Sequence, residues 1–89
     1  MEHNSYRLND KVLFQKVADE TVILDPDSGQ YFTLDTIGTA MLEKLQEGAK
    51  VGEVVTQIMA SYDVQQAQLL DDLTELINTM QQKELLVCV

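Results

Sequence analysis

The chain has 89 residues and a mass of 10.0 kDa, which is enough for one small domain. Hydrophobic residues make up 45% and charged residues 24% of it, a composition typical of a folded globular domain rather than a disordered segment. The 15 acidic and 6 basic residues give a formal net charge of -9, which argues against binding to nucleic acids or to anionic membrane surfaces, because both require clustered Lys and Arg.

The N-terminal part of the chain changes character near residue 11. Residues 1–10 are polar and show no periodicity, so we expect a flexible N-terminal segment there and a single domain over residues 11–89. The stretch 12–18 is mostly apolar and partly β-branched, which favours a first strand.

A second and a third strand flank the clearest turn in the sequence. Residues 21–24 are rich in β-branched side chains, and residues 30–34 include two aromatic ones. The segment between them, Asp25-Pro26-Asp27-Ser28-Gly29, combines a proline that presets φ, side chains that bond nearby backbone, and a glycine that accepts positive φ. The pattern predicts an antiparallel hairpin.

Helical spacing of apolar residues begins after the third strand. Asp35 or Thr36 can cap a first helix, which Gly48 ends. Its apolar residues are Ile37, Met41, Leu42 and Leu45. A second helix is expected over about residues 51–61, with Val54, Val55, Ile58 and Met59 as its buried stripe.

The third helix has the widest apolar stripe. It is predicted to begin near Gln65, with Asp63 as its cap. The stripe consists of Leu69, Leu70, Leu73, Leu76, Ile77 and Met80. Residues 85–89 are apolar and indicate a short final strand. Three strands followed by three helices predict an α+β fold, with a small three-stranded antiparallel sheet packed on helices.

The third strand is expected to lie at an edge of the sheet. It contains no Lys or Pro of the kind that protects an exposed edge, so its backbone groups are available to an added strand. The third helix beside it would complete a groove in which apolar residues border carboxylates, which suits a peptide with apolar anchors and a basic residue. The candidate peptide-binding residues are Gln30, Tyr31, Phe32, Thr33 and Leu34 on the strand and Leu69, Asp72, Leu73, Glu75 and Leu76 on the helix. If these residues have only a structural role, most of the leucines fill the core and the acidic residues form a solvent-exposed face of the helix.

Residues of the kinds that form catalytic or metal-binding sites are scarce. The only histidine is His3, and there is no Cys/His cluster, no glycine-rich phosphate loop and no nucleophile beside a histidine. We therefore expect no catalytic residues, no metal site and no cofactor. The single cysteine, Cys88, cannot form an internal disulfide, and the polar start lacks a signal peptide, so the expected compartment is the cytoplasm. No apolar run approaches the roughly 20 residues that span a bilayer.

The order of these elements resembles that of PqqD-like proteins. The matching strand and turn residues are Val22-Ile23-Leu24-Asp25, Ser28-Gly29 and Tyr31-Phe32-Thr33-Leu34-Asp35. The matching helix and exit residues are Gly38, Leu42 to Leu45, Glu47-Gly48, Val51, Val54-Val55, Tyr62-Asp63-Val64, Asp72-Leu73, Leu76, Met80 and Leu85-Leu86. The resemblance covers about residues 12–87. The sequence departs from the family pattern at three places: Asp35 replaces the usual Asn, Lys83-Glu84 replaces a glycine, and the Tyr-Pro-Glu-Gly sequence typical of PqqD itself is absent. These differences argue against a role in the pyrroloquinoline-quinone pathway more than against membership of the wider family.

This resemblance implies a winged helix-turn-helix-like peptide-recognition element of ribosomal peptide-natural-product pathways. Such domains bind the leader segment of a precursor peptide as an added strand between the third strand and the third helix, and deliver it to a maturation enzyme. Stand-alone members of lasso-peptide pathways work with a cysteine-protease-like leader peptidase and a cyclase, and others partner radical-SAM enzymes. The short chain and its Ser28-Gly29-Gln30-Tyr31 turn are closer to the lasso type.

Other functions remain open on sequence grounds. A winged-helix DNA-binding protein has the same outline, but Asp71, Asp72 and Glu75 on the third helix would repel phosphate. A carrier protein needs a serine at a helix start for phosphopantetheine, whereas Ser28 precedes Gly29 and a strand. An adaptor or antitoxin-type module would use the same sheet edge to bind another protein, and a homodimer through the sheet edge is equally compatible with the sequence.

Overall fold

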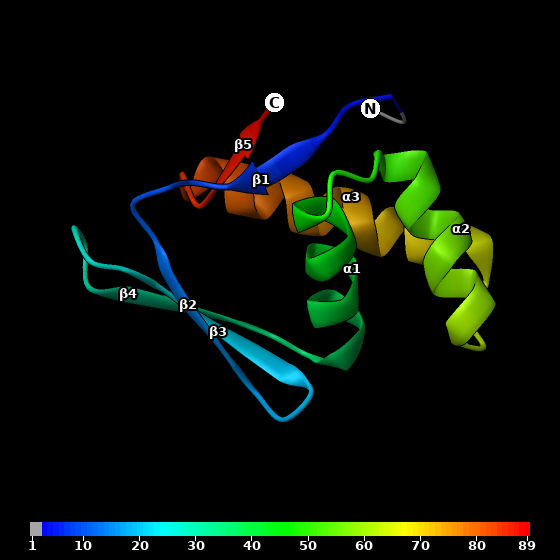
Figure 1. Cartoon of the computed structure of the whole chain (residues 1–89), viewed down its shortest axis with the longest axis horizontal. Helices are drawn as coiled ribbons and strands as arrows, with labels where there is room; N and C mark the ends of the chain where they lie inside the picture. The colour runs from blue at the N-terminus through cyan, green and yellow to red at the C-terminus, as the bar shows by residue number, and fades with distance from the viewer. Residues whose placement is uncertain (1–2) are drawn as a thin grey trace.

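Two small antiparallel sheets and three helices make up the computed structural model, which describes residues 3–89 (Figure 1). The strands are β1 (Tyr6–Leu8), β2 (Leu13–Val17), β3 (Glu20–Asp25), β4 (Gln30–Leu34) and β5 (Leu86–Cys88). The helices are α1 (Thr36–Gln46), α2 (Val51–Ser61) and α3 (Gln66–Gln82). The predicted α+β class, with a three-stranded antiparallel sheet followed by three helices in a winged helix-turn-helix-like outline, is confirmed.

The three-stranded sheet forms from the segments predicted as strands, in the order β2-β3-β4. Leu13 lies opposite Leu24 between β2 and β3, and Asp25 lies opposite Gln30 between β3 and β4. The predicted hairpin is confirmed, and the Gly29 N–H donates to the Asp25 carbonyl at 2.8 Å to close its turn. In Figure 1 this sheet extends away from the helices, with α1 nearest to it.

The N-terminal segment does not behave as the sequence predicted. Tyr6–Leu8 form β1, which pairs antiparallel with β5, so the interpretation of residues 1–10 as a flexible lead-in is wrong for this part. Tyr6 and Leu8 are buried, and the Leu8 N–H donates to the Gln46 side-chain oxygen at 2.8 Å. Burial of alternate apolar side chains and pairing with the chain's other end therefore hold this segment in place. Met1 and Glu2 lie outside the described residues.

The helices begin and end close to the predicted positions. Asp35 caps α1, its carboxylate accepting a hydrogen bond from the Gly38 N–H at 2.8 Å. Gly48, with a φ of 96°, follows the helix end, where only glycine adopts that conformation at no cost. The third helix also starts close to the predicted residue, at Gln66, but the prediction of Asp63 as its cap was wrong: Gln65 is the N-cap of α3, without a side-chain hydrogen bond, and Asp63 lies outside the helix.

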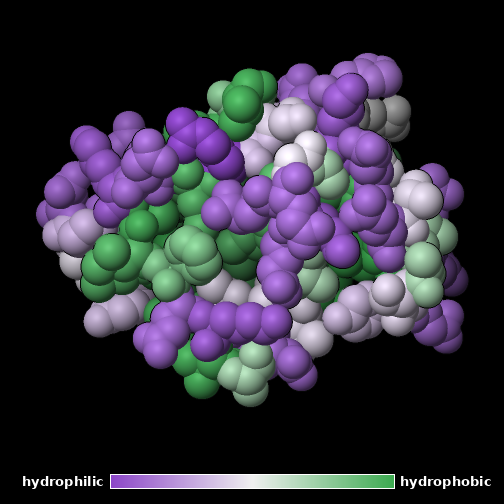
Figure 2. Space-filling view, in the orientation of Figure 1, coloured by the Kyte–Doolittle hydropathy of each residue, from purple (hydrophilic) through white to green (hydrophobic). Residues whose placement is uncertain are grey.

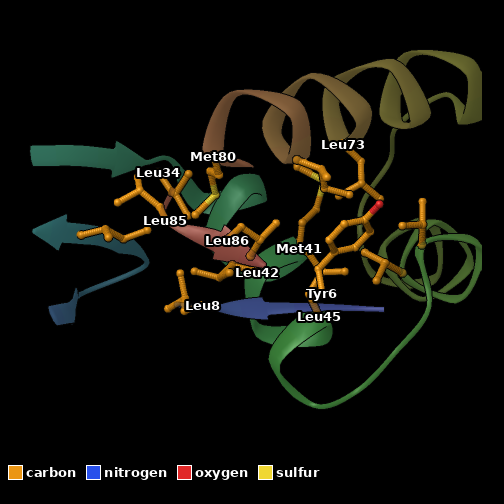
Figure 3. Close-up of a cluster of buried hydrophobic side chains, with 14 of the residues drawn as sticks. Tyr6, Leu8, Leu34, Met41, Leu42, Leu45, Leu73, Met80, Leu85 and Leu86 are labelled. Carbon is orange, nitrogen blue, oxygen red and sulfur yellow. The ribbon is translucent and has the colours of Figure 1, made fainter. Parts of the chain in front are cut away.

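One apolar core joins the two sheets and the three helices (Figure 3). It contains residues from β1, β3, β4, all three helices and the C-terminal segment. The close-up labels Tyr6, Leu8, Leu34, Met41, Leu42, Leu45, Leu73, Met80, Leu85 and Leu86. Among the buried side chains of residues 3–89, one polar pair joins β3 to α1: the hydroxyls of Thr21 and Thr39 lie 2.8 Å apart. Each hydroxyl thus satisfies the other, and the pair fixes α1 against the sheet.

Replacing Asp35 with Ala should lower the free energy of unfolding by about 1 kcal/mol, because the first turn of α1 loses its side-chain acceptor. Urea denaturation followed by circular dichroism would measure the change. Asp35→Asn is the matched control, since an Asn side chain also accepts this hydrogen bond. Equal losses in both variants would contradict the capping role and point to the charge of Asp35 instead.

Candidate functional site

The candidate site lies along β4, which is an edge strand as predicted. Its inner edge pairs with β3, and in the described part of the chain no strand pairs with its outer edge. Leu34 is buried and Phe32 half-buried, whereas Tyr31 and Thr33 are exposed, because alternate residues of a strand face opposite sides of the sheet. The backbone of β4 therefore borders open space on one side.

A groove with a volume of about 790 Å³ runs beside this edge. Four elements line it: β3, β4, the start of α1 and the middle of α3. Its lining residues are Glu20, Thr21, Val22, Phe32, Thr33, Leu34, Asp35, Ile37, Gly38, Met41, Asp72, Glu75, Leu76 and Thr79. The groove is thus bounded by an unpaired strand edge on one side and a helix on the other, the arrangement that accepts an extended peptide.

The junction between β4 and α1 shapes the floor of the groove. Asp35 caps α1 directly after the last residue of β4, so the chain turns from strand to helix within the site. A Cβ atom on Gly38 would lie 3.3 Å from the Leu34 Cβ and 3.2 Å from an Asp35 carboxylate oxygen, so glycine allows this close approach. Ile37 and Met41 then extend the apolar floor along α1 toward α3.

The groove is acidic. Glu20, Asp35, Asp72 and Glu75 contribute carboxylates, and the described lining residues include no Lys, Arg or His. Within residues 3–89 none of these four acids forms an ion pair, and Asp72 accepts a hydrogen bond only from the Gln68 side chain, at 2.9 Å. A ligand with basic side chains beside apolar ones would match this lining.

The structure brings six of the ten predicted site residues to the groove: Phe32, Thr33, Leu34, Asp72, Glu75 and Leu76. Gln30 and Tyr31 lie on the exposed part of β4, outside the groove lining. Leu69 and Leu73 are in the core, with 2% and 0% of their surface exposed. Their side chains point into the core rather than into the groove, because the apolar stripe of α3 is wider than the part that borders β4.

Sequence reasoning missed the residues from β3 and α1, together with Thr79. Thr79 lies one turn beyond Glu75 and Leu76, so helical spacing alone could have placed it on the same face. The sequence predicts Ile37 and Met41 on the apolar face of the first helix, without relating that face to the groove. No residue signal distinguishes a core face from a groove floor when the neighbouring strand is an edge.

Two further features bear on function. The described residues contain no group of three or more His, Cys, Asp or Glu side chains placed to hold a metal ion. Within the same residues, no helix combines the length and apolar character needed to cross a bilayer. Cys88, the last residue of β5, is exposed and is not part of a disulfide.

Comparison with known families decides the classification. The model of the family described as Coenzyme PQQ synthesis protein D (PqqD) matches residues 20–86. The chain belongs to the PqqD family. The match begins at β3 and includes β4, all three helices and the start of β5, so every lining residue of the groove lies in the matched part of this PqqD-family chain. A comparison with curated proteins returned no match.

Two solved structures resemble this PqqD-family chain over nearly their whole length. TbiB1 in complex with the TbiA(beta) leader peptide is 34% identical, with a TM-score of 0.81 over 90% of this chain and 93% of that chain. A lasso peptide synthetase B1 complexed with the leader peptide has a TM-score of 0.84 over 93% of this chain and 98% of that chain. Its 19% identity shows a common fold alone.

Proposed function

We propose that this chain binds the leader segment of a ribosomally made precursor peptide and delivers it to a maturation enzyme. The leader lies in the groove as an added strand on β4, facing α3. Its backbone bonds the open edge of β4, and its alternate side chains reach the apolar floor and the acidic border. Binding tethers the substrate near the enzyme at high effective concentration, so the chain needs no catalytic residues and no cofactor of its own.

The observation that carries this proposal is the unpaired edge of β4 beside a groove of about 790 Å³. A relative that is 34% identical over most of its length was solved with a leader peptide, which supports the same ligand class here. The short chain and its Ser28-Gly29-Gln30-Tyr31 turn favour a lasso-peptide pathway, with a cysteine-protease-like leader peptidase and a cyclase as partners, over one with a radical-SAM enzyme. We place this activity in the cytoplasm, where precursor peptides are synthesised.

The alternatives find less support in the residues. Ser28 lies in the β3–β4 turn, where its hydroxyl donates to Asp25 at 3.0 Å, a poor attachment point for phosphopantetheine. The described helix α3 contains no Lys or Arg for phosphate contacts. An adaptor or antitoxin-type module would use the same edge of β4, but for a folded partner rather than a free peptide.

Titration with a synthetic leader peptide from the precursor encoded beside this chain tests the proposal. Backbone amide shifts should change along residues 30–34 and on the groove-lining residues of α1 and α3, and stay constant in α2. Calorimetry should detect binding of the linear peptide alone, which an adaptor for a folded partner would not give. Shifts confined to other elements, or no binding, would refute the proposal.

Asp72→Lys should weaken binding of a leader that has a basic residue, by about threefold at low salt and less at high salt. The exposed carboxylate contributes attraction that salt screens, and its reversal adds repulsion. Asp71→Lys is the matched control, because Asp71 is the neighbouring exposed acid on α3 and does not line the groove. Equal effects of the two variants would assign the change to net charge rather than to the groove.

A further inference from the structure

The other edge strand of the sheet, β2, has unusual side chains for an exposed position. All five of its residues are exposed, and Leu13, Phe14 and Val17 expose 60%, 57% and 56% of their surface. Figure 2 shows hydrophobic side chains gathered on the part of the molecule that the sheet forms. Within residues 3–89 no strand pairs with the outer edge of β2. An apolar, unpaired edge of this kind is a template for another strand.

We propose that two copies of this chain associate through antiparallel pairing of their β2 strands. The sequence of β2, Leu13-Phe14-Gln15-Lys16-Val17, is complementary to itself in this orientation. With Gln15 opposite its own copy, Leu13 of each copy lies opposite Val17 of the other, and Phe14 lies opposite Lys16. In an isologous interface both copies contribute the same residues, so the patch must complement itself, and both kinds of pair are favourable across strands.

The two faces of β2 both support this register. Leu13 and Val17 lie on the face away from α1, so the pairing gathers four aliphatic side chains there. Phe14 and Lys16 lie on the α1 side, where they border a hollow of about 230 Å³ between β2 and α1. The buried Leu42 contributes to that hollow. A strand added to β2 places its own Phe14 beside it.

The charge distribution selects this edge for contact between two copies. Each copy has a formal net charge of -9, so most approaches are repulsive. Residues 11–18 contain Lys11 and Lys16 and no acid, and Lys16 lies 3.3 Å from Glu43 of its own chain. The β2 strand therefore adds no carboxylate of its own to the contact, and Lys16 offsets the charge of the neighbouring Glu43. The β4 edge lies beside four groove acids and is the less favourable of the two.

The dimer leaves β4 free, because β2 and β4 are at opposite edges of the sheet. Two copies joined at β2 form one continuous sheet with a peptide groove at each end. The inference does not rest on the proposed function: a chain that binds no leader would still dimerise at β2. If leader peptide binds, the complex should contain two chains and two peptides.

Sedimentation velocity of the full chain over a concentration series tests the dimer. A reversible monomer–dimer equilibrium is expected, with a smaller dissociation constant at high salt because salt screens the repulsion between the two copies. A monomer at every concentration would overturn the proposal. So would dissociation of the dimer by a saturating leader peptide, since that result assigns the contact to β4.

A charge exchange tests the register. One variant has glutamate at both positions (Leu13→Glu with Val17→Glu), and the other has lysine at both (Leu13→Lys with Val17→Lys). Each variant alone should show a dissociation constant raised more than about tenfold, and an equimolar mixture of the two should form a heterodimer. Met59→Glu is the control and should dimerise normally, because Met59, which the sequence predicted in the buried stripe of the second helix, is exposed on α2. Thermal unfolding checks that the exposed substitutions leave the fold intact. Dimerisation of either doubly charged variant alone, or a mixture that stays monomeric, would overturn the β2 register.

Discussion

Thr33→Pro should weaken leader binding more than about tenfold without lowering the stability of the free chain. Proline removes the backbone donor at this residue and places its ring where the added strand would lie. The expectation depends on the direction of the Thr33 N–H, which the pairing of β3 and β4 indicates. Calorimetry with the leader peptide measures the affinity, and thermal unfolding measures the stability.

Residues opposite each other in an antiparallel pair are alternately hydrogen-bonded and not. The hairpin closes at Asp25 and Gln30, so we expect this pair to be bonded, and the pair of Ile23 with Phe32 as well. The intervening pair of Val22 with Thr33 is then the unbonded one. The N–H of Thr33 therefore points away from β3, toward the groove side of the edge.

Lys16→Pro is the matched control for this substitution. Lys16 lies on the opposite edge strand. The β2–β3 hairpin closes at Val17 and Glu20, so we expect that pair to be hydrogen-bonded and the next pair, Lys16 with Thr21, to be unbonded, which gives Lys16 an outward N–H. It should retain the leader affinity of the unmodified chain. A stable Thr33→Pro variant with unchanged affinity would show that the leader does not add to β4. A marked loss of stability would instead place the Thr33 donor inside the sheet.

The segments that the sequence predicted correctly are those whose signals are local. The β-branched run at residues 21–24, the turn at Pro26 and the helix end at Gly48 each depend on neighbours in the chain, and all three are confirmed. β1 depends on a distant partner, because its three residues form a strand only by pairing with β5 at the other end of the chain. Three residues of local pattern do not reveal such a pairing.

The candidate site was predictable only in part for a related reason. The edge position of β4 follows from a three-stranded meander, and the acids of α3 follow from helical spacing. The orientation of α3 about its own axis does not, because it depends on packing against α1, α2 and β5. That orientation puts Leu76 in the groove and Leu73 in the core, although both belong to one apolar stripe.

Leu73→Ala should lower the free energy of unfolding by about 3 kcal/mol, because Leu73 has no exposed surface and its truncation leaves a cavity in the core. A domain of this size should then melt roughly 10 °C or more below the original chain. Chemical denaturation measures the stability, and leader affinity should be unchanged in conditions where the variant remains folded.

Leu76→Ala, three residues further along α3, should reduce the affinity for the leader peptide and have less effect on stability. Leu76 is half-buried and lines the groove, so its truncation removes an apolar contact with the peptide and leaves a smaller defect in the core. We expect a smaller loss of stability than for Leu73→Ala and an affinity reduced about tenfold, the loss that follows when a buried aliphatic anchor loses its contact surface. Because both residues are leucines on the same helix, a difference between the two variants reports the different positions of their side chains. An affinity loss in Leu73→Ala that equals that of Leu76→Ala, without loss of stability, would mean that α3 presents a different face to β4.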